Sequence, residues 1–222
     1  MNIKICTPVI GNTLDFFLSN LVKTQEISNF IELRVDNIKN LSIKDIDIIR
    51  QKTNVSAILT CRSMSEGGLY RKSEGDRIRI LQLAIGKFDY IDIELETVKN
   101  HHFNRNNKTK FIISYHNLKE TPSFWEIQKI IYLMNLYHPD IIKIATMIQH
   151  DYEKTKIYRL LTNKPHNEER IAIGMGEKGK ITRIVGPLLG SYLTYASTEW
   201  GETDQGQLEI EKLKRIYDSL SY

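Results

Sequence analysis

The chain has 222 residues, of which 41% are hydrophobic and 26% are charged, so it is expected to fold around a core rather than to stay disordered. Its net charge of +4 is too small to indicate a nucleic-acid partner, but it suits a small anionic substrate. No apolar run approaches the roughly 18 residues that a membrane-spanning helix needs. The opening residues lack the layout of a signal peptide, and the two cysteines, Cys6 and Cys61, lie in different apolar runs. We therefore expect a cytoplasmic protein without a disulfide framework and without a membrane partner.

Short apolar runs with the length and composition of β-strands recur along the whole chain. They are residues 2–6, 30–35, 55–61, 90–95, 110–115, 140–145, 170–175 and 192–197. Apolar residues in the segments between them recur with helical spacing, most clearly in 14–24, 78–85 and 124–134. Helix starts are indicated by Ser42, by Ser73 with Asp76 three residues on, and by Ser123 with Glu126 three residues on.

This alternation of strands and helices predicts parallel strands joined by right-handed crossovers. Eight such units in a chain of this length predict an α/β fold, a single (β/α)8 barrel of TIM type over residues 1–222. An open doubly wound sheet is the main alternative, but it usually has fewer strands and a glycine-rich turn after the first one. Here the first strand runs into CTPVIGN, and GMGEKG at 174–179 fits neither the dinucleotide fingerprint nor a phosphate loop.

Polar side chains gather where most of the predicted strands end, and that end of a barrel is where catalytic residues lie. They are Glu32, Arg34 and Asp36; Thr60, Cys61, Arg62 and Glu66; Asp92 and Glu94; Ser114, Tyr115, His116 and Asn117; Lys143; Arg183; and Glu202, Thr203 and Gln207. Each of these taken alone fits a structural ion pair or hydrogen bond. Their coincidence at successive strand ends favours a functional site.

Lys143 is the most unusual of these residues, because the run around it, PDIIKIATM at 139–147, is otherwise nearly apolar. An ammonium group is rarely buried without a partner, so a structural pair with Asp92 or Glu94 is one interpretation. The other is chemical. A partly desolvated amine loses its proton more readily, and its neutral form can attack a ketone to give a Schiff base.

A Schiff base acidifies the neighbouring carbon, so a general base must stand nearby, and His116 on the preceding strand is the candidate. Either Glu66 or Glu94 could orient that histidine. Three arginines suit a substrate that has a carboxylate and several hydroxyls: Arg34, Arg62 and Arg183. No two His or Cys residues have the spacing of metal ligands, so no metal is expected.

Seven fragments spread over nearly the whole length of the chain form a recognisable set. They are ELRVD (32–36), TCRSMSEGG (60–68), DIEL (92–95), SYHN followed by TP (114–117 and 121–122), IIKIATM (141–147), GMGEKGKITRIVG (174–186) and GQ (206–207). In this order they resemble the type I 3-dehydroquinate dehydratases. The resemblance implies a (β/α)8 barrel, usually a homodimer, that needs no cofactor. It also implies the dehydration of 3-dehydroquinate to 3-dehydroshikimate, in the shikimate pathway of aromatic amino-acid biosynthesis, through a lysine imine.

Carried over by position, the resemblance implies that Lys143 forms the imine and that His116 is the general acid and base, with Glu66 as its partner. It implies that six residues hold the substrate: Glu32, Arg34, Arg62, Arg183, Thr203 and Gln207. Asp92 and Glu94 match an acidic pair with a supporting role. The chain departs from the family at TDQGQ (203–207), where a Ser-Ala-Pro-Gly-Gln type run is common, and at Cys6, where a small hydroxyl residue is common.

Two other functions remain open from the residues themselves. A class I aldolase also has an imine lysine on a barrel strand, but it usually binds phosphorylated sugars, whereas Arg183 and the GQ loop suit a carboxylate and hydroxyls. A non-catalytic protein, such as an RNA-binding barrel or a degenerate homologue, is disfavoured by the low net charge and by the joint presence of Lys143, His116 and Arg183. Because the chain ends soon after its last predicted helix, we expect no fused dehydrogenase domain.

Overall fold

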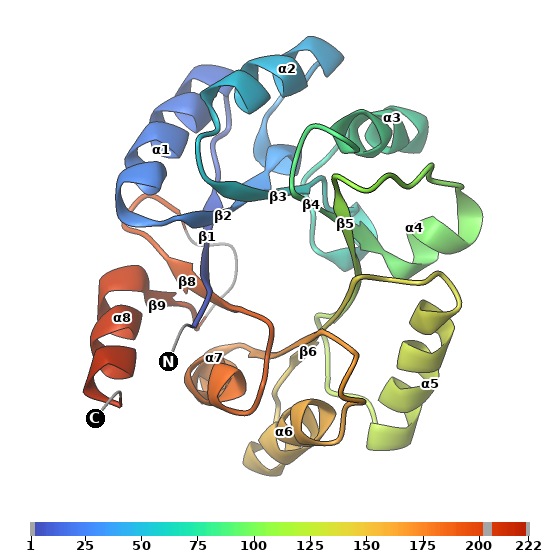
Figure 1. Cartoon of the computed structure of the whole chain (residues 1–222), viewed down its shortest axis with the longest axis vertical. Helices are drawn as coiled ribbons and strands as arrows, with labels where there is room; N and C mark the ends of the chain where they lie inside the picture. The colour runs from blue at the N-terminus through green and yellow to red at the C-terminus, as the bar shows by residue number, and fades with distance from the viewer. Residues whose placement is uncertain (1–2, 202–205, 221–222) are drawn as a thin grey trace.

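A computed structural model of the chain describes residues 3–201 and 206–220, and in this part nine strands form a ring that is surrounded by helices (Figure 1). The strands are β1 (Ile5–Val9), β2 (Phe30–Arg34), β3 (Ser56–Thr60), β4 (Tyr90–Glu94), β5 (Lys110–Asn117), β6 (Ile141–Met147), β7 (Arg170–Met175), β8 (Thr194–Ser197) and β9 (Leu208–Glu209). The α-helices are α1 (Leu14–Ile27), α2 (Ile43–Lys52), α3 (Glu74–Ala84), α4 (Leu95–Asn100), α5 (Phe124–Asn135), α6 (Lys154–Thr162), α7 (Lys180–Leu188) and α8 (Ile210–Ser219). Short 3-10 helices are η1 (Val35–Asn37), η2 (Met64–Glu66), η3 (Asp151–Glu153) and η4 (Glu177–Gly179).

The strands pair in the order β7-β6-β5-β4-β3-β2-β1-β8-β9, and each neighbouring pair is parallel. The ring is closed beside β7, where the N–H of Tyr192, two residues before β8, donates to the Arg170 carbonyl at 2.8 Å. Strands that follow one another in the chain are therefore neighbours around a ring, with a helix after most of them. The predicted α/β barrel is confirmed.

The predicted strands agree with the observed ones except at the N-terminus. The first prediction, residues 2–6, is too early, because β1 covers Ile5–Val9. Thr7 continues this strand although it is polar, since its buried hydroxyl donates to Ser28 Oγ at 3.1 Å. The two-residue strand β9 was not predicted, because so short a segment has no periodic pattern. No helix within residues 3–201 and 206–220 has the length and apolar character needed to cross a membrane.

The interior of the barrel is apolar at one level and polar at the next. The lower layer consists of buried apolar side chains: Phe30, Ile58, Tyr90, Ile112, Ile141 and Ile171. Two residues further along the same strands lie Glu32, Thr60, Asp92, Ser114, Lys143 and Ile173. Because side chains of a strand alternate between its two faces, both sets point inward. The polar layer therefore lies directly above a layer of buried apolar side chains, close to the carboxyl ends of the strands.

The opposite faces of the strands pack against the helices. One cluster joins Leu33, Leu59 and Ile93 of the sheet to Phe17 and Leu81 of α1 and α3. A second cluster joins β5, β6 and β7 to α5 and α6. A slip of one residue would move inward charged side chains such as Glu32, Asp92 and Lys143 to the face that packs against the helices, so the register of these strands is fixed.

The helix starts predicted from the sequence are confirmed, and the one at Ser123 is a capping box. The Glu126 N–H donates to Ser123 Oγ at 3.3 Å, and the Ser123 N–H donates to Glu126 Oε2 at 2.8 Å. Both bonds satisfy backbone donors that the first turn of α5 would otherwise leave without partners.

Replacing this cap should destabilise the protein without affecting its site. We expect Ser123→Ala to lower the free energy of unfolding by about 1 kcal/mol, because the Glu126 N–H loses its acceptor. Ser123→Asp, which keeps an acceptor at this position, is the matched control and should stay close to the wild type. Urea denaturation followed by circular dichroism measures both, and equal stability of the two variants would contradict a role for the cap.

Candidate active site

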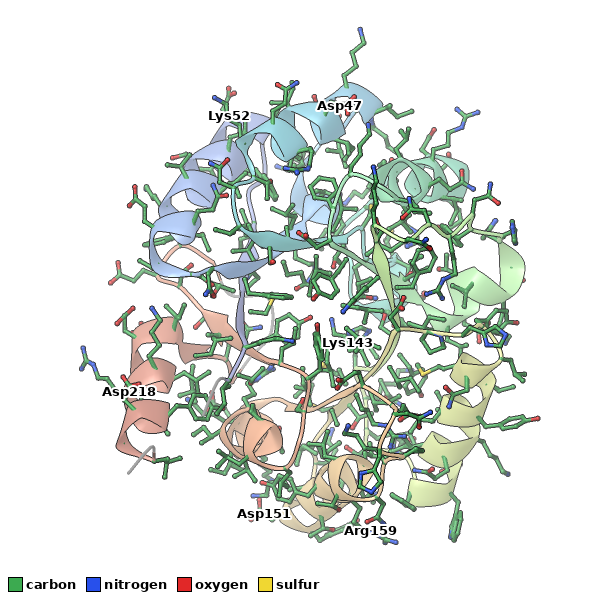
Figure 2. All side chains as sticks on the ribbon, in the orientation of Figure 1. Asp47, Lys52, Lys143, Asp151, Arg159 and Asp218 are labelled. Carbon is green, nitrogen blue, oxygen red and sulfur yellow. The ribbon has the colours of Figure 1, made fainter. Side chains whose placement is uncertain are left out.

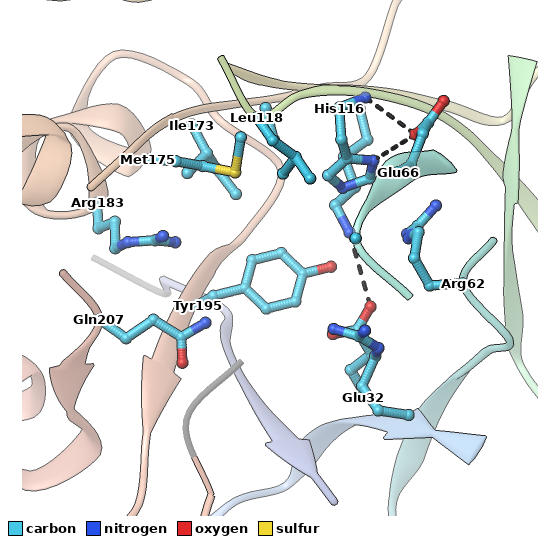
Figure 3. A pocket seen from close by; sticks show the side chains of 14 residues that line it. Glu32, Arg62, Glu66, His116, Leu118, Ile173, Met175, Arg183, Tyr195 and Gln207 are labelled. Atoms are coloured by element: carbon cyan, nitrogen blue, oxygen red, sulfur yellow. Dashed lines mark hydrogen bonds and ion pairs between the residues drawn. The ribbon is translucent and has the colours of Figure 1, made fainter. Parts of the chain in front are cut away.

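A cavity opens into the barrel at the carboxyl ends of the strands, and its empty space is about 570 Å³, including the part open to solvent. Eight of the residues predicted for the site line it: Glu32, Arg34, Arg62, Glu66, His116, Lys143, Arg183 and Gln207 (Figure 3). Asp92 and Glu94 lie directly behind this lining, in contact with Arg62. The predicted residue Thr203 lies outside the described residues.

Lys143 lies on β6 near the centre of the ring of strands (Figure 2) and is only 4% exposed. Its Nζ is 2.7 Å from Asp92 Oδ2 and 3.6 Å from Glu32 Oε1. It also lies 4.7 Å from the centre of the Tyr195 ring, within range of a cation–π contact. The ion pair that the sequence left as an alternative therefore exists, with Asp92 as its nearest member. An amine held in this way is fixed in position at the floor of the cavity.

Asp92 is the acceptor for three donors, from β5, from β6 and from the loop after β3. Lys143 Nζ lies at 2.7 Å, Arg62 at 2.8 Å and the Ser114 hydroxyl at 2.6 Å. Burial alone would raise the pKa of this carboxyl, but the charges of Arg62 and Lys143 hold the pKa of Asp92 well below its usual range. Asp92 thus stays ionised and supplies a permanent negative charge next to the lysine.

Glu94 serves the arginines rather than the histidine. Its carboxylate accepts from Arg62 at 3.1 Å, from Arg77 at 2.9 Å and from the Ser63 N–H at 2.8 Å. The buried Arg77 of α3 also donates to the Cys61 carbonyl at 2.8 Å. Glu94 and Arg77 together hold Arg62 and the beginning of the loop that leads to Glu66.

His116 and Glu66 form a second pair at the mouth of the cavity. His116 Nδ1 lies 2.7 Å from Glu66 Oε2, and the His116 backbone N–H donates to the same oxygen at 3.0 Å. Burial, together with the charges of Arg62 and Lys143, holds the pKa of His116 well below its usual value. Burial raises the pKa of Glu66 to about 8, although the charge of Arg62 opposes this shift. Because Nδ1 is engaged by Glu66, Nε2 is the ring nitrogen that a ligand can meet.

A tight loop sets the position of Glu66 on η2. The Gly68 N–H donates to the Ser63 carbonyl at 2.8 Å, which folds the loop back on itself. A Cβ at Gly68 would lie 1.9 Å from the Arg62 carbonyl oxygen, closer than any side chain can approach. The glycine pair in the fragment TCRSMSEGG is therefore a requirement of the turn that carries Glu66 to His116.

The remaining arginines occupy different parts of the cavity. Arg34 stands near the rim in a two-point pair with Asp36, with N–O distances of 3.0 and 2.9 Å. Arg183 comes from α7, and its side chain is buried beside the cavity. In Figure 3, Arg183 and Gln207 lie on one side of the cavity and Glu32 and Arg62 on the other. The two sides can therefore recognise different groups of one ligand.

Several residues of the site were missed from the sequence. Arg77 lies in a helical segment, where an arginine usually faces solvent, so its pattern gave no sign that it is buried. Tyr195 and Met175 lie in the predicted strands 192–197 and 170–175 and were not singled out, yet both line the cavity. For Tyr195 a signal was available, because it stands on the last predicted strand beside the other strand ends. Within the described residues, no group of three His, Cys, Asp or Glu side chains is placed to hold a metal ion.

Together the fold and the cavity define a (β/α)8 barrel with a buried polar site at the carboxyl ends of its strands. Residues 5–222 match the family described as type I 3-dehydroquinase. A 3-dehydroquinate dehydratase of Coxiella burnetii (strain Dugway 5J108-111) is 40% identical over 217 residues, which cover 96% of this chain and 92% of the relative. The corresponding protein of Methanococcus maripaludis (strain C6) is 36% identical over 220 residues, covering 96% and 98%.

The structures agree with this relationship. The crystal structure of a type I 3-dehydroquinate dehydratase from Clostridium difficile with covalent modified comenic acid has a TM-score of 0.85 at 26% identity, covering 98% of this chain and 92% of that one. The chain belongs to the type I 3-dehydroquinase family. The resemblance and the enzyme class predicted from the sequence are confirmed.

The raised pKa of Glu66 makes a prediction about stability. Between about pH 4.5 and about pH 8 the unfolded carboxyl ionises while the folded one keeps its proton. The contribution of Glu66 to the free energy of unfolding is therefore complete below this window and is lost as the pH rises through it. Glu66→Gln, which cannot ionise, should lose less stability than the wild type across the same window. Urea unfolding of both proteins at several pH values measures the difference, and parallel curves would rule out the raised pKa.

Proposed function

We propose that this protein dehydrates 3-dehydroquinate to 3-dehydroshikimate in the shikimate pathway, with Lys143 as the imine-forming lysine and His116 as the general acid and base. The observation that carries the proposal is one cavity lined by Lys143, His116 and Arg183 together. The names of the relatives from Coxiella burnetii and Methanococcus maripaludis support the choice of substrate. The homodimer, the cytoplasmic location and the single domain over residues 1–222 remain predictions.

The two sides of the cavity suit the two ends of the substrate. Arg183, with Gln207 near it, would bind the carboxylate at C1, because a guanidinium forms strong charge-assisted hydrogen bonds with this group. Glu32 and Arg62, with Arg34 at the rim, would bind the ring hydroxyls on the other side. This orientation leaves the ketone at C3 for the lysine between them.

Lys143 would form the imine after its ammonium has given up a proton. The neutral nitrogen attacks C3, a new C–N bond forms, and the carbonyl oxygen leaves as water. The protonated imine then has the same charge as the ammonium that it replaces, in the same place. Asp92, which is held ionised by Arg62, can therefore stabilise both states without moving.

His116 would remove a proton from C2, next to the imine carbon, and the electron pair of the C–H bond moves toward the imine nitrogen. The hydroxyl at C1 then leaves as water with a proton from His116, and hydrolysis of the imine releases the product and restores the lysine. The strand register supports this arrangement. Ser114 pairs with Lys143 across β5 and β6, and His116 stands two residues beyond Ser114 on the same inward face. Glu66 would hold Nδ1 so that Nε2 faces the reacting carbon.

Reductive trapping tests the identity of the lysine. When borohydride is added to the protein with 3-dehydroquinate, we expect a covalent adduct that peptide mass spectrometry locates on Lys143. Lys143→Ala should give no adduct, whereas Lys99→Ala, which changes an exposed lysine, should give the same adduct as the wild type. An adduct on any other lysine would disprove the proposed mechanism.

The role of His116 is tested by separating imine formation from turnover. His116→Ala should still be trapped on Lys143, while kcat falls roughly 10²- to 10⁴-fold because proton transfer has lost its catalyst. His166→Ala, at an exposed histidine outside the cavity, is the control and should keep the wild-type rate. A variant without His116 that retains full activity would assign the proton transfer to another group.

A further inference from the structure

The hydroxyl of Tyr195 is buried and lacks a hydrogen-bond partner among the described residues. The residue is only 3% exposed and belongs to β8. Another buried tyrosine of the barrel behaves differently, since the hydroxyls of Tyr90 and Tyr192 lie 2.7 Å apart. A buried polar group without a partner destabilises the folded protein, so its presence calls for a physical reason.

The position of Tyr195 suggests that reason, because the residue lines the cavity next to Lys143. Figure 3 shows its ring between the two sides of the cavity, with the hydroxyl directed toward Glu32 and Arg62 and away from Arg183 and Gln207. The hydroxyl is therefore aimed into the part of the site where Lys143 Nζ meets the carboxylates.

The surroundings of the hydroxyl determine what it can bind. Burial raises the pKa of Tyr195 well above its usual value, and the negative charge of Glu32 adds to the shift. The phenol therefore stays protonated and can donate a hydrogen bond. A hydroxyl group on a ligand can accept this bond and donate one in turn to the Glu32 carboxylate. A ligand carboxylate would be repelled by Glu32 at the same place.

We propose that Tyr195 is a specificity-determining residue that donates a hydrogen bond to the C4 hydroxyl of the bound substrate. The inference rests on the proposed function, since an imine between Lys143 and C3 brings the neighbouring C4 hydroxyl to the groups around Nζ. Besides Asp92, those groups include Glu32, at 3.6 Å from Nζ, and the Tyr195 ring, at 4.7 Å. The hydrogen bond that the protein alone leaves unmade is completed by the substrate.

Tyr195→Phe tests this assignment because it removes one oxygen and keeps the ring. We expect KM for 3-dehydroquinate to rise about tenfold, which corresponds to the loss of roughly one hydrogen bond. The thermal midpoint should stay equal or rise, because no bond within the protein is lost. Tyr90→Phe is the matched control. It breaks the bond to Tyr192 outside the cavity, so it should lower the thermal midpoint and leave KM unchanged.

The 4-deoxy analogue of 3-dehydroquinate identifies the partner of the hydroxyl. In the wild type the analogue should bind at least tenfold more weakly than the substrate, because it lacks the bonds to both Tyr195 and Glu32. In Tyr195→Phe this difference should be about tenfold smaller, because only the bond to Glu32 is left to lose, as expected for two groups that contact each other. An unchanged KM in Tyr195→Phe would overturn the inference. So would losses of affinity from the variant and from the analogue that add independently. Either result applies to the inference alone as long as wild-type turnover and the Lys143 adduct persist. Absence of that turnover and adduct would instead overturn the proposed function, and the inference with it.

Discussion

Buried charges in the barrel mouth compensate one another through a chain of ion pairs, and both the site and the barrel around it are held by these contacts. Lys143 pairs with Asp92, Asp92 with Arg62, Arg62 with Glu94, and Glu94 with Arg77. All five side chains are nearly inaccessible to solvent, so each charge needs its neighbours to replace the water it has lost. Removing one partner of a buried pair typically costs about 3–5 kcal/mol. The chain of pairs joins the loop after β3 to β4, β6 and α3, so the geometry of the site and the packing of the barrel are determined together.

Arg62 connects this network to the acid–base pair. Its guanidinium holds Asp92 and Glu94 ionised through direct contacts, and its charge also contributes to the low pKa of His116. The same charge opposes the effect of burial on Glu66. One arginine thus influences both the lysine side and the histidine side of the cavity. The contacts by which Arg62 balances Asp92 and Glu94 therefore also place its charge where it influences the protonation of His116 and Glu66.

Most of the fold was predictable because two periods in the sequence, alternation in the strands and 3.6 in the helices, specify which faces are buried. The same alternation placed Glu32, Asp92 and Lys143 in one inward layer. What the sequence did not determine was the choice of partners. Asp92 and Glu94 stand on the same face of β4 and both contact Arg62, but the second partner of Asp92 is Lys143, whereas that of Glu94 is Arg77. Arg77 belongs to a helix whose pattern does not distinguish a buried arginine from an exposed one, and Tyr195 has the apolar character of core.

The distribution of charge suits the proposed reaction because little of it needs to change. Exchange of an ammonium for an iminium at Lys143 leaves the net charge next to Asp92 as it was, so the buried pairs keep their geometry. When His116 accepts the proton from C2, the positive charge of the iminium moves to the imidazole, and Glu66 is the group that contacts this ring. Fixed dipoles and charges that need not reorganise stabilise a transition state more effectively than mobile ones. The buried ion pairs around Lys143 meet that requirement, since they are packed on an apolar layer, and the His116–Glu66 pair at the mouth of the cavity is the part that changes its protonation.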